Sequence, residues 1–373
     1  MELKYNNKLT FDEILKKSSN YEVVSKKGKN LNKLIFGENL NGLDYLINKE
    51  NLKGKIDLIY IDPPFSTNNT FSIDDSSRVS TISNSKNGSV AYTDKLKGYD
   101  FIEFLRERVI LLKELLSENG SFYLHIDYKI GHYVKVMLDE VFGIDNFRND
   151  ITRIKCNPKN FKRKGYGNIK DLILFYSKSE NMIWNEPKQP YSQSDIEKLY
   201  SKVDKKGRRY TTVPIHAPGE TKEPQLFKGN LPPVGRHWRT NVDELERLDE
   251  QGLIEWSSKG NPRMIIFADE KEGKRVQDIW EFKDPQYPLY PTQKNSDLLD
   301  LIIKTSSNPD SLVLDCFCGS GSTLLSASRN QRNWIGVDSS EQSIKIVKKQ
   351  LKEFDGLLFS NYTDYDFVEL KEK

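Results

Sequence analysis

Two short segments of the sequence place polar residues where they could do chemistry. In residues 313–321 (VLDCFCGSG) an apolar run ends at Asp315 and a glycine turn follows. Gly319 and Gly321 let the backbone turn sharply and approach a ligand without a Cβ in the way. A second apolar run ends at Asp338, whose carboxylate could accept hydrogen bonds from both hydroxyls of a ribose. These features predict a site for an adenosine-containing cofactor, although a plain tight turn has the same glycine spacing.

The other segment, Asp62 to Phe65 (DPPF), directly follows the apolar run 56–61 (IDLIYI). Pro63 and Pro64 fix the backbone φ angle and remove two N–H donors, which leaves rigid carbonyl acceptors. The exocyclic amino group of adenine carries two N–H donors. Asp62 and the Pro63 carbonyl could accept both while the nitrogen attacks a methyl sulfonium, and Phe65 offers a face on which a flipped base could stack. The alternative is an ordinary turn with a solvated Asp62, because Pro-Pro is typical of turns.

The elements that would position these residues alternate between strands and helices. We expect strands over 33–37, 56–61, 121–126, 151–156, 172–177, 312–314 and 334–337. We expect helices over 102–116, with Gly120 as its stop signal, over 298–305, from 321 onward, and over 344–351. This alternation is typical of an α/β fold with a mostly parallel sheet covered on both faces. Ligands bind at the carboxyl ends of such strands, so the two segments should line one crevice.

Composition sets the middle of the chain apart. Residues 181–290 hold 10 of the 15 prolines and four of the five tryptophans. This proline density disfavours long regular elements and predicts a loop-rich module. We therefore divide the chain into an N-terminal extension (1–30), a first α/β half (31–180), the inserted module (181–290) and a second α/β half (291–373).

The overall composition excludes several classes of protein. With 36% hydrophobic and 30% charged residues, the chain should be soluble, and it has no apolar run long enough to span a membrane. The polar first 20 residues do not resemble a secretory signal. Cys156, Cys316 and Cys318 form no even disulfide framework, which favours a reducing cytoplasm. No zinc site is expected, because Cys-Xaa-Cys lacks nearby partners to complete four ligands.

Taken together, the two segments resemble the amino-methyltransferases of DNA. The Asp-Pro-Pro-Phe motif precedes the Asp-Xaa-Phe-Xaa-Gly-Xaa-Gly motif, and that order resembles the beta class, which includes the modification subunits of Type III restriction systems. Residues 290–294 (YPTQK) are similar to that class's motif before the glycine loop. The resemblance covers about residues 31–355. It implies a Rossmann-like, seven-stranded methyltransferase sheet with one antiparallel strand, a circularly permuted motif order and a target-recognition insertion at 181–290.

The resemblance also implies a reaction and roles for individual residues. It implies methyl transfer from S-adenosyl-L-methionine to the N6 amino group of adenine in duplex DNA, with the catalytic motif formed by Asp62, Pro63, Pro64 and Phe65. By the same resemblance, the residues that contact the cofactor are Asp315, Phe317, Gly319, Gly321, Asp338, Glu38, Thr292 and Lys294. For Glu38 the alternative is a carboxylate at a helix start. Cys316 and Cys318 stand where the family often has proline and alanine, and Phe65 replaces the commoner tyrosine.

Other functions stay open at this point. Cytosine N4 is the nearest alternative acceptor, and adenine is favoured because cytosine members of the family more often carry serine at the position of Asp62. An RNA or small-molecule methyltransferase would share the fold, but the inserted module disfavours it. A nicotinamide oxidoreductase would not explain the Asp-Pro-Pro-Phe motif. A catalytically inactive DNA-binding protein is disfavoured by the intact Asp62 and glycine loop.

Basic residues with interleaved aromatics suggest where DNA would bind. Lys162, Arg163 and Lys164 lie in the loop 158–168 (PKNFKRKGYGN) and suit a phosphate backbone, although a solvated basic loop has the same composition. The polar stretch 66–98 should order over DNA and close on a flipped base, unless it is a passive insertion.

Arginines of the inserted module could read guanine edges with two hydrogen bonds each. The candidates are Arg208, Arg209, Arg236 and Arg239. His216 and His237 have no spacing that suggests catalysis or a metal. The resemblance further implies a homodimer, a cognate restriction subunit and a bacterial cytoplasmic, nucleoid-associated location.

Overall fold

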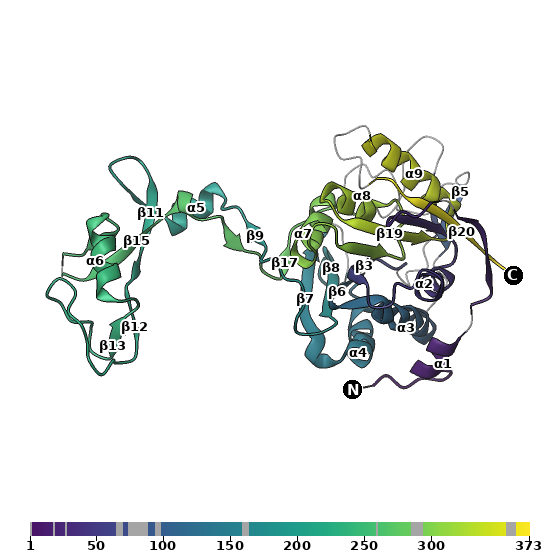
Figure 1. Cartoon of the computed structure of the whole chain (residues 1–373), viewed down its shortest axis with the longest axis horizontal. Coiled ribbons are helices and arrows are strands. Elements are labelled where there is room, and N and C mark those ends of the chain that lie inside the picture. The colour runs from purple at the N-terminus through teal and green to yellow at the C-terminus, as the bar shows by residue number, and fades with distance from the viewer. Residues whose placement is uncertain are drawn as a thin grey trace. The chain divides into compact units, whose positions relative to one another are not determined.

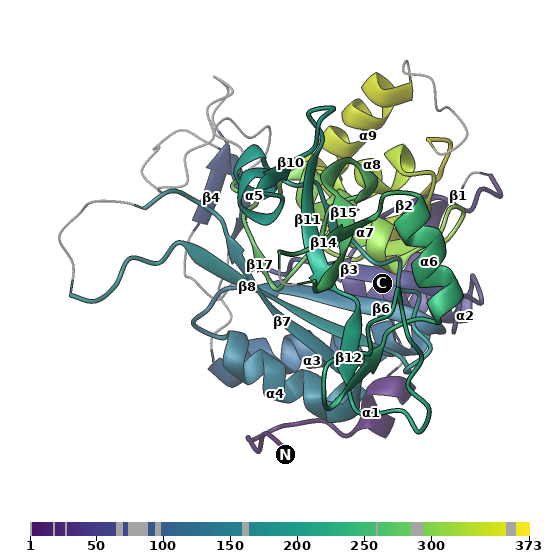
Figure 2. The ribbon, with the colours of Figure 1, turned by 90° about the vertical axis from the view of Figure 1, so that its left-hand side faces the viewer.

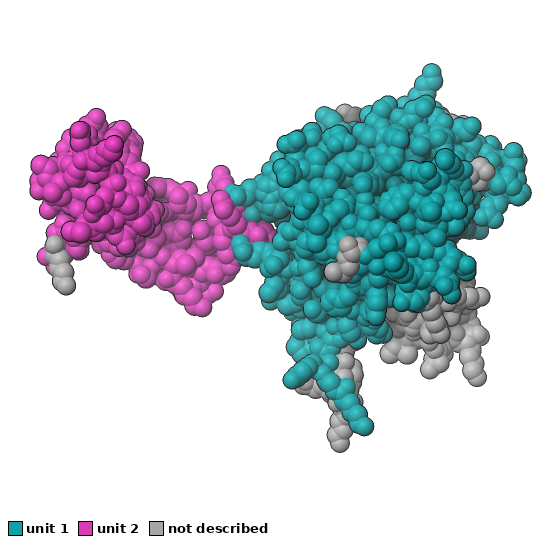
Figure 3. Space-filling model, turned by 90° about the horizontal axis from the view of Figure 1, so that it is seen from below, with its two compact units in different colours: residues 1–187, 277–373 teal, residues 188–276 magenta. Residues whose placement is uncertain are grey.

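The computed structural model describes residues 2–17, 19–26, 28–64, 70–73, 89–93, 98–158, 164–258, 260–284, 294–355 and 363–373. The chain forms two compact units, which Figure 3 shows in different colours. Unit 1 contains residues 1–187 and 277–373, and unit 2 contains residues 188–276. Each unit is described by itself below.

A large, mostly parallel sheet forms the centre of unit 1. Seven strands lie side by side in the order β2 (Lys33–Phe36), β19 (Asn333–Asp338), β18 (Leu312–Asp315), β3 (Ile56–Ile61), β6 (Leu116–Ile126), β8 (Lys170–Ser177) and β7 (Phe147–Ile154). Within this group β8 alone runs antiparallel to its two neighbours. The prediction of a Rossmann-like, seven-stranded sheet with one reversed strand is confirmed for this central part.

Further strands extend the sheet at both edges, to ten strands among the described residues. At one edge β20 (Asp366–Glu372) runs parallel to β2, and β1 (Tyr21–Lys26) pairs antiparallel with β20. At the other edge β17 (Ile279–Trp280) pairs parallel with β7. These three edge strands were not among the seven that the sequence predicted.

Helices cover both faces of the sheet (Figure 1). One face is covered by α2 (Asn39–Asn48), α3 (Gly98–Leu115) and α4 (Gly131–Phe142), and the other by α7 (Ser296–Ser306), α8 (Ser322–Arg329) and α9 (Glu341–Asp355). Successive strand residues point to opposite faces. Ile59 and Ile61 of β3 accordingly share an apolar core with Leu105 of α3, and Tyr60 points to the α7 face.

The start of β6 differs from the prediction. Helix α3 ends at Leu115, and Gly120 lies inside β6 rather than at the end of the helix. The pairing of β6 with β3 is irregular between Ile56 and Leu58. A Cβ atom on Gly120 would stand 2.7 Å from side-chain carbons of Leu116, so close packing within the strand accounts for the glycine.

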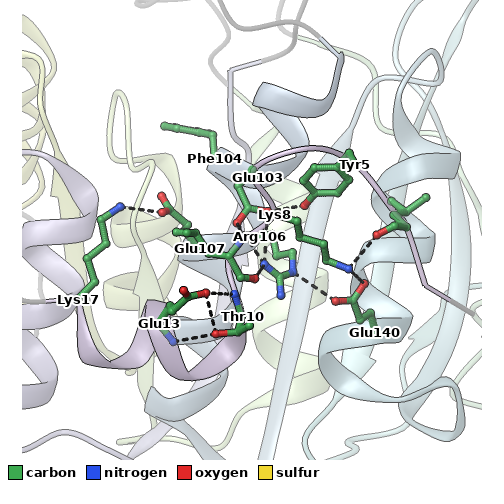
Figure 4. A network of polar contacts seen from close by, with 12 residues as sticks. Tyr5, Lys8, Thr10, Glu13, Lys17, Glu103, Phe104, Arg106, Glu107 and Glu140 are labelled. Carbon is green, nitrogen blue, oxygen red and sulfur yellow. Dashed lines mark hydrogen bonds and ion pairs between the residues drawn. The ribbon is translucent and has the colours of Figure 1, made fainter.

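The N-terminal segment is fastened to α3 and α4 by a network of polar contacts (Figure 4). Arg106 of α3 is buried, and its Nη1 donates to the Leu9 carbonyl at 2.8 Å. Glu103 accepts hydrogen bonds from the Leu9 N–H and the Tyr5 hydroxyl. Lys8 binds Glu140 of α4, with 2.8 Å between Nζ and Oε2. These contacts hold the segment that leads through α1 (Phe11–Lys16) to the edge strand β1.

Unit 2 is a small antiparallel module. Its main sheet has the order β10 (Lys202–Val203), β11 (Arg209–Pro214), β15 (Pro262–Phe267) and β14 (Ile254–Trp256). The other elements are β9 (Lys188–Gln189), β16 (Lys274–Arg275), β12 (His216–Pro218), β13 (Arg236–Trp238), α5 (Gln193–Leu199), α6 (Val242–Glu250) and the 3-10 turn Ala268–Glu270. Its core contains Phe227, Trp238 and Leu245. Its strands β11, β12 and β15 are labelled in Figure 2.

Two smaller features complete the description. A hairpin of β4 (Thr70–Ile73) and β5 (Ser89–Thr93) lies within the polar stretch 66–98, and most of the rest of that stretch is outside the described residues. A 3-10 turn, Ile144–Asn146, joins α4 to β7. No described helix combines the length and apolar character that a membrane span requires.

Candidate active site

Acidic residues follow one another along the edge where the parallel strands end. Glu38 comes two residues after β2, Asp338 ends β19, Asp315 ends β18, Asp62 follows β3 and Asp127 follows β6. These five strands are adjacent and parallel, so we call the five residues the acid row. The carboxyl ends of such strands are where α/β sheets bind ligands. The structure thus brings the two predicted segments together, although they lie about 250 residues apart in sequence, as the pairing of Leu58 with Val313 illustrates.

Asp127 was missed by sequence reasoning. It directly follows the strand predicted at 121–126, in the position that singled out Asp62, so the same signal could have found it. It is buried, and its Oδ1 accepts the Lys129 N–H at 2.9 Å.

The glycine turn is held by the carboxylates of the acid row. Asp315 is 3% exposed; its Oδ1 accepts the Phe317 N–H at 3.0 Å and its Oδ2 accepts the Thr323 hydroxyl at 2.6 Å. The Gly319 N–H donates to Asp338 Oδ2 at 2.8 Å. Gly321 has a φ of +83° at the start of α8, where a Cβ would come within 2.9 Å of Val347. The turn therefore needs its second glycine.

Burial shapes the charge of this half of the site. It raises the pKa of Asp315 to about 7, and the charges of Asp62 and Asp338 add to that rise. Burial also raises the pKa of Asp338, against the hydrogen bonds of Ser340 and Gly319. A carboxylate oxygen can accept more than one hydrogen bond, so these groups can still receive hydroxyls and attract a cation. The ribose hydroxyls and positive sulfonium of S-adenosyl-L-methionine fit these acidic acceptors at the edge of the sheet.

Asp62 has a different environment. Its Oδ2 forms an ion pair with Lys294 Nζ at 2.9 Å, and both side chains are largely buried. Its Oδ1 is buried and has no hydrogen-bond partner among the described residues. An unsatisfied buried acceptor typically costs about 1–3 kcal/mol. The unpaired Oδ1 could therefore accept a hydrogen bond from a ligand donor that reaches it. Pro63 is buried beside it and Pro64 is half-buried.

Other predicted contacts of the cofactor are placed as follows. Glu38 caps the start of α2, where its Oε2 accepts the Leu40 N–H at 2.6 Å, and its Oε1 pairs with Arg108. The helix-start role is therefore present, and a contact with the cofactor stays a prediction. Phe317 is half-buried with its ring 6.3 Å from that of Phe104. Lys294 lies at Asp62, and its predicted contact with the methionine end stays a prediction.

Several predicted residues lie outside the described part of the chain, namely Phe65, Thr292, Lys162 and Arg163. Lys164 is described and exposed. Cys156, Cys316 and Cys318 are free thiols, the last two buried. Among the described residues, no group of three or more histidine, cysteine or acidic side chains could hold a metal ion.

The arginines predicted to contact DNA differ in their surroundings within unit 2. Arg208 is engaged by acids: its Nε and Nη2 donate to Asp269 at 2.9 Å, and Nη2 also donates to Glu270 at 2.8 Å. Its guanidinium also lies over the Phe267 ring. These partners engage Nε and Nη2, and a contact of Arg208 with DNA stays a prediction. Arg209 is half-buried, and its Nη1 lies 3.5 Å from the Tyr200 carbonyl.

Arg236 and Arg239 are exposed and lie beside His216. Arg236 Nη1 is 3.2 Å from His216 Nδ1, and Arg239 Nε donates to the His216 carbonyl at 3.2 Å. Burial and the charges of Arg236, Arg239 and Arg263 lower the pKa of His216. Positive charge is therefore concentrated around this hairpin, in contrast to the neutralised Arg208.

Fold and site together define a Rossmann-like methyltransferase, and comparison with known proteins gives the family. Residues 56–349 match the N6_N4_Mtase family model, described as DNA methylase. The Type II methyltransferase M.EcaI of Enterobacter cloacae is 40% identical over 327 residues, covering 86% of this chain and 69% of that protein. The M.KpnI methyltransferase of Klebsiella pneumoniae is 25% identical over 421 residues, covering 95% and 94%.

Two further likenesses differ in extent. A probable Type III HindVI Mod subunit of Haemophilus influenzae is 26% identical, over 94% of this chain and 57% of that protein. Among solved structures, the M1.HpyAVI–SAM complex matches with a TM-score of 0.44 and 18% identity, over 85% of this chain and 99% of that chain. The family match and the likeness to M.EcaI show that the chain belongs to the DNA methylase family. It is a DNA amino-methyltransferase of the restriction-modification type, and its cofactor is S-adenosyl-L-methionine.

Proposed function

We propose that the protein methylates the N6 amino group of adenine at a specific site in duplex DNA. The observation that carries this proposal is the state of Asp62: its Oδ2 is paired with Lys294, and its buried Oδ1 has no hydrogen-bond partner in the part of the chain that the structure describes. One amino N–H of a flipped adenine would donate to Oδ1 and the other to the Pro63 carbonyl. Both bonds leave the nitrogen lone pair directed away from these acceptors.

The residues of the chain supply binding and orientation. Asp315, Asp338, Gly319 and Gly321 form the wall that would hold the cofactor, with Phe317 and Glu38 beside it. S-adenosyl-L-methionine supplies an electrophilic methyl group when bound. The amino nitrogen would form the new N–C bond as the C–S bond breaks, and it would then release one proton to solvent. No thiolate is needed, in agreement with the raised pKa of the buried thiols of Cys316 and Cys318.

Cytosine N4 is the second candidate, because its amino group carries the same two donors. Adenine is favoured by the aspartate at position 62, where cytosine enzymes of the family more often have serine. The test is transfer of a labelled methyl group to duplex DNA followed by nucleoside analysis. N6-methyladenine is the expected product; N4-methylcytosine would replace the adenine assignment, and unlabelled DNA would contradict the proposed function. Asp12→Asn, a change at an exposed carboxylate of α1, is a control that should keep full activity.

Recognition of the DNA sequence is assigned to region 181–290, which contains unit 2. The exposed Arg236 and Arg239 beside His216 support this assignment, since arginine can bind guanine O6 and N7 together. The loop that contains Lys162, Arg163 and Lys164 would bind phosphates. Arg208 and Arg209 have partners within unit 2 and would contribute less.

A homodimer and a cognate restriction subunit are further proposals, supported by the likeness to the beta class. Light scattering of the purified protein would test the first, and co-purification with a neighbouring nuclease gene product would test the second. A monomer at micromolar concentration would contradict the dimer.

A further inference from the structure

A buried chain of polar groups lies beneath Asp62, and sequence reasoning did not find it. The Tyr60 hydroxyl is 3.0 Å from His125 Nδ1, and His125 Nε2 is 3.3 Å from Asp171 Oδ2. All three residues are at most 2% exposed. Buried polar groups with complete partners fix the arrangement of the elements that carry them.

The sheet register places this chain directly beside the catalytic carboxylate. Tyr60 and Asp62 are two positions apart at the end of β3, and therefore point to the same face. The parallel pairing of β3 with β6 joins Ile61 to Leu124, so the next position sets Asp62 beside His125. Cross-strand neighbours in the same register share a face. The imidazole is thus the lateral neighbour of Asp62 on the face toward α7.

The buried network of polar groups extends from Asp171, through Arg153, to Phe282 and Asp284. Asp171 forms ion pairs with Lys155, at 2.6 Å, and with Arg153, at 3.6 Å. The buried Arg153 also donates from Nε to the Phe282 carbonyl at 2.8 Å and pairs with Asp284. Asp284 is thus paired with Arg153, and Lys294 is paired with Asp62.

The hydrogen bonds define the protonation state of the ring. Burial works to raise the pKa of Asp171, but the hydrogen bond from His125 and the charge and hydrogen bond of Lys155 hold it below its usual range, so it stays ionised. An ionised carboxylate accepts a proton-bearing Nε2, which leaves Nδ1 as the acceptor for the Tyr60 hydroxyl. Burial and the charge of Lys294 lower the pKa of His125 against the opposing effect of Asp171. The neutral imidazole is therefore the form that fits.

We propose that His125 is a positioning residue for methyl transfer, whose neutral ring, fixed between Tyr60 and Asp171, keeps the Asp62–Lys294 pair aligned. The proposal rests on the role of Asp62 under the proposed function. A protonated ring would place a second cation beside Asp62 and compete with Lys294 for its carboxylate. The titratable and charged groups around the ring are Tyr60, Asp62, Asp127, Arg153, Lys155, Asp171 and Lys294.

The sign of the pH dependence follows from the neutral state. Because the pKa of His125 is lowered, the ring stays neutral at neutral pH, and kcat should fall only when the pH drops below the ordinary histidine range. The measurement is kcat against pH at saturating cofactor and DNA, since kcat reports groups of the bound enzyme.

Tyr60→Phe is the sharpest test, since it removes one hydroxyl and keeps the ring that fills the core. Loss of a hydrogen bond to the neutral imidazole raises the pKa of His125, so the acid limb of the kcat profile should move to higher pH. At neutral pH kcat should fall about two- to tenfold, the range expected for one hydrogen bond, with the KM for S-adenosyl-L-methionine unchanged. His125→Gln keeps an N–H donor toward Asp171 but has no titratable ring, so the acid limb of the kcat profile should disappear.

Tyr123→Phe is the matched control. Tyr123 is equally buried on the same face of β6, but its hydroxyl is 2.8 Å from Ser306 Oγ rather than near His125. It should lower the melting temperature about as much as Tyr60→Phe and leave the pH profile in place. Overlapping profiles for Tyr60→Phe, Tyr123→Phe and the unchanged enzyme would overturn the role of His125. If Asp62→Ala is inactive in that case, the proposed function stands and only the role of His125 is contradicted. If Asp62→Ala is active, the proposed role of Asp62 and the role of His125 are both contradicted.

Discussion

Asp315 and Asp62 stand at the ends of adjacent strands, yet their oxygens have different partners. Both oxygens of Asp315 accept hydrogen bonds from its own turn, through the Phe317 N–H and the Thr323 hydroxyl. Asp62 has one oxygen in an ion pair with Lys294, and the other has no hydrogen-bond partner among the residues that the structure describes. The Asp315 carboxylate stabilises the glycine turn through its own hydrogen bonds, whereas the Asp62 carboxylate has an acceptor oxygen left for a ligand. The same residue type at the same edge thus serves structure in one half and chemistry in the other.

The largest expected effect comes from removing the open acceptor. Asp62→Ala should abolish methyl transfer and leave S-adenosyl-L-methionine binding nearly unchanged, because the glycine turn does not depend on Asp62. Labelled-methyl transfer and calorimetry of cofactor binding measure the two properties. If a folded Asp62→Ala protein lost cofactor binding, Asp62 would belong to the cofactor site, and the distinction between Asp62 and Asp315 would not hold.

Removing a carboxylate of the wall should have the opposite pattern. Asp338→Ala deprives Gly319 and Ser340 of their acceptor and removes a partner for the cofactor hydroxyls. Loss of a hydrogen bond to a charged group costs about 1.5–3 kcal/mol, so cofactor affinity should fall roughly ten- to 150-fold. Activity should return in part at high cofactor concentration. Unchanged affinity by calorimetry would remove Asp338 from the cofactor site.

The raised pKa of Asp315 should produce a smaller effect, a pH dependence of kcat/KM for the cofactor, which distinguishes the cofactor site from Asp62. Since the pKa of this carboxyl is raised to about 7, the free enzyme loses its charge as the pH falls through that value. The ionised form attracts the positively charged cofactor, so kcat/KM for S-adenosyl-L-methionine should decrease below pH 7 by up to about tenfold per pH unit. Asp315→Asn should bind the cofactor more weakly and show a flatter profile. An equally steep fall in that variant would assign the titration to another group.

The DNA contacts permit a similar comparison between phosphate and base recognition. Changing Lys162, Arg163 and Lys164 together to alanine should weaken binding to all sequences. The slope of log affinity against log salt should become shallower by up to about 0.9 per lost phosphate contact. Binding to matched and scrambled duplexes over a range of salt measures both properties. An altered sequence preference with an unchanged slope would show that this loop reads bases.

The smallest effects are expected within unit 2. Arg236→Ala and Arg239→Ala should change which sequence is methylated, by about 1–3 kcal/mol of discrimination for each base contact. Arg208→Ala should leave the preference unchanged, because Asp269 and Glu270 already occupy its guanidinium. Methylation of a randomised duplex library, read by sequencing, compares the three variants. A change of preference in Arg208→Ala would mean that its ion pairs open on DNA.

The sequence by itself determined the elements whose patterns are local. The strand at 56–61 is found with the predicted bounds, and the strands ending at Asp315 and Asp338 are found within a residue of theirs. Continuous apolar runs mark buried parallel strands, and an acid directly after such a run must stand at the sheet edge. The types and order of the motifs likewise led to the family.

Only the tertiary structure decided which strands are neighbours, and with them the contacts across the sheet. Tyr60, His125 and Asp171 belong to three neighbouring strands, and no local sequence pattern predicts that these strands are neighbours. The edge strands β1 and β20 pair residues about 350 positions apart, and their stability depends on the partner more than on their own composition. The engagement of Arg208 by Asp269 and Glu270 is a contact of the same kind. A charged residue has the same sequence signal whether it is free or paired, because pairing is a property of the folded neighbourhood.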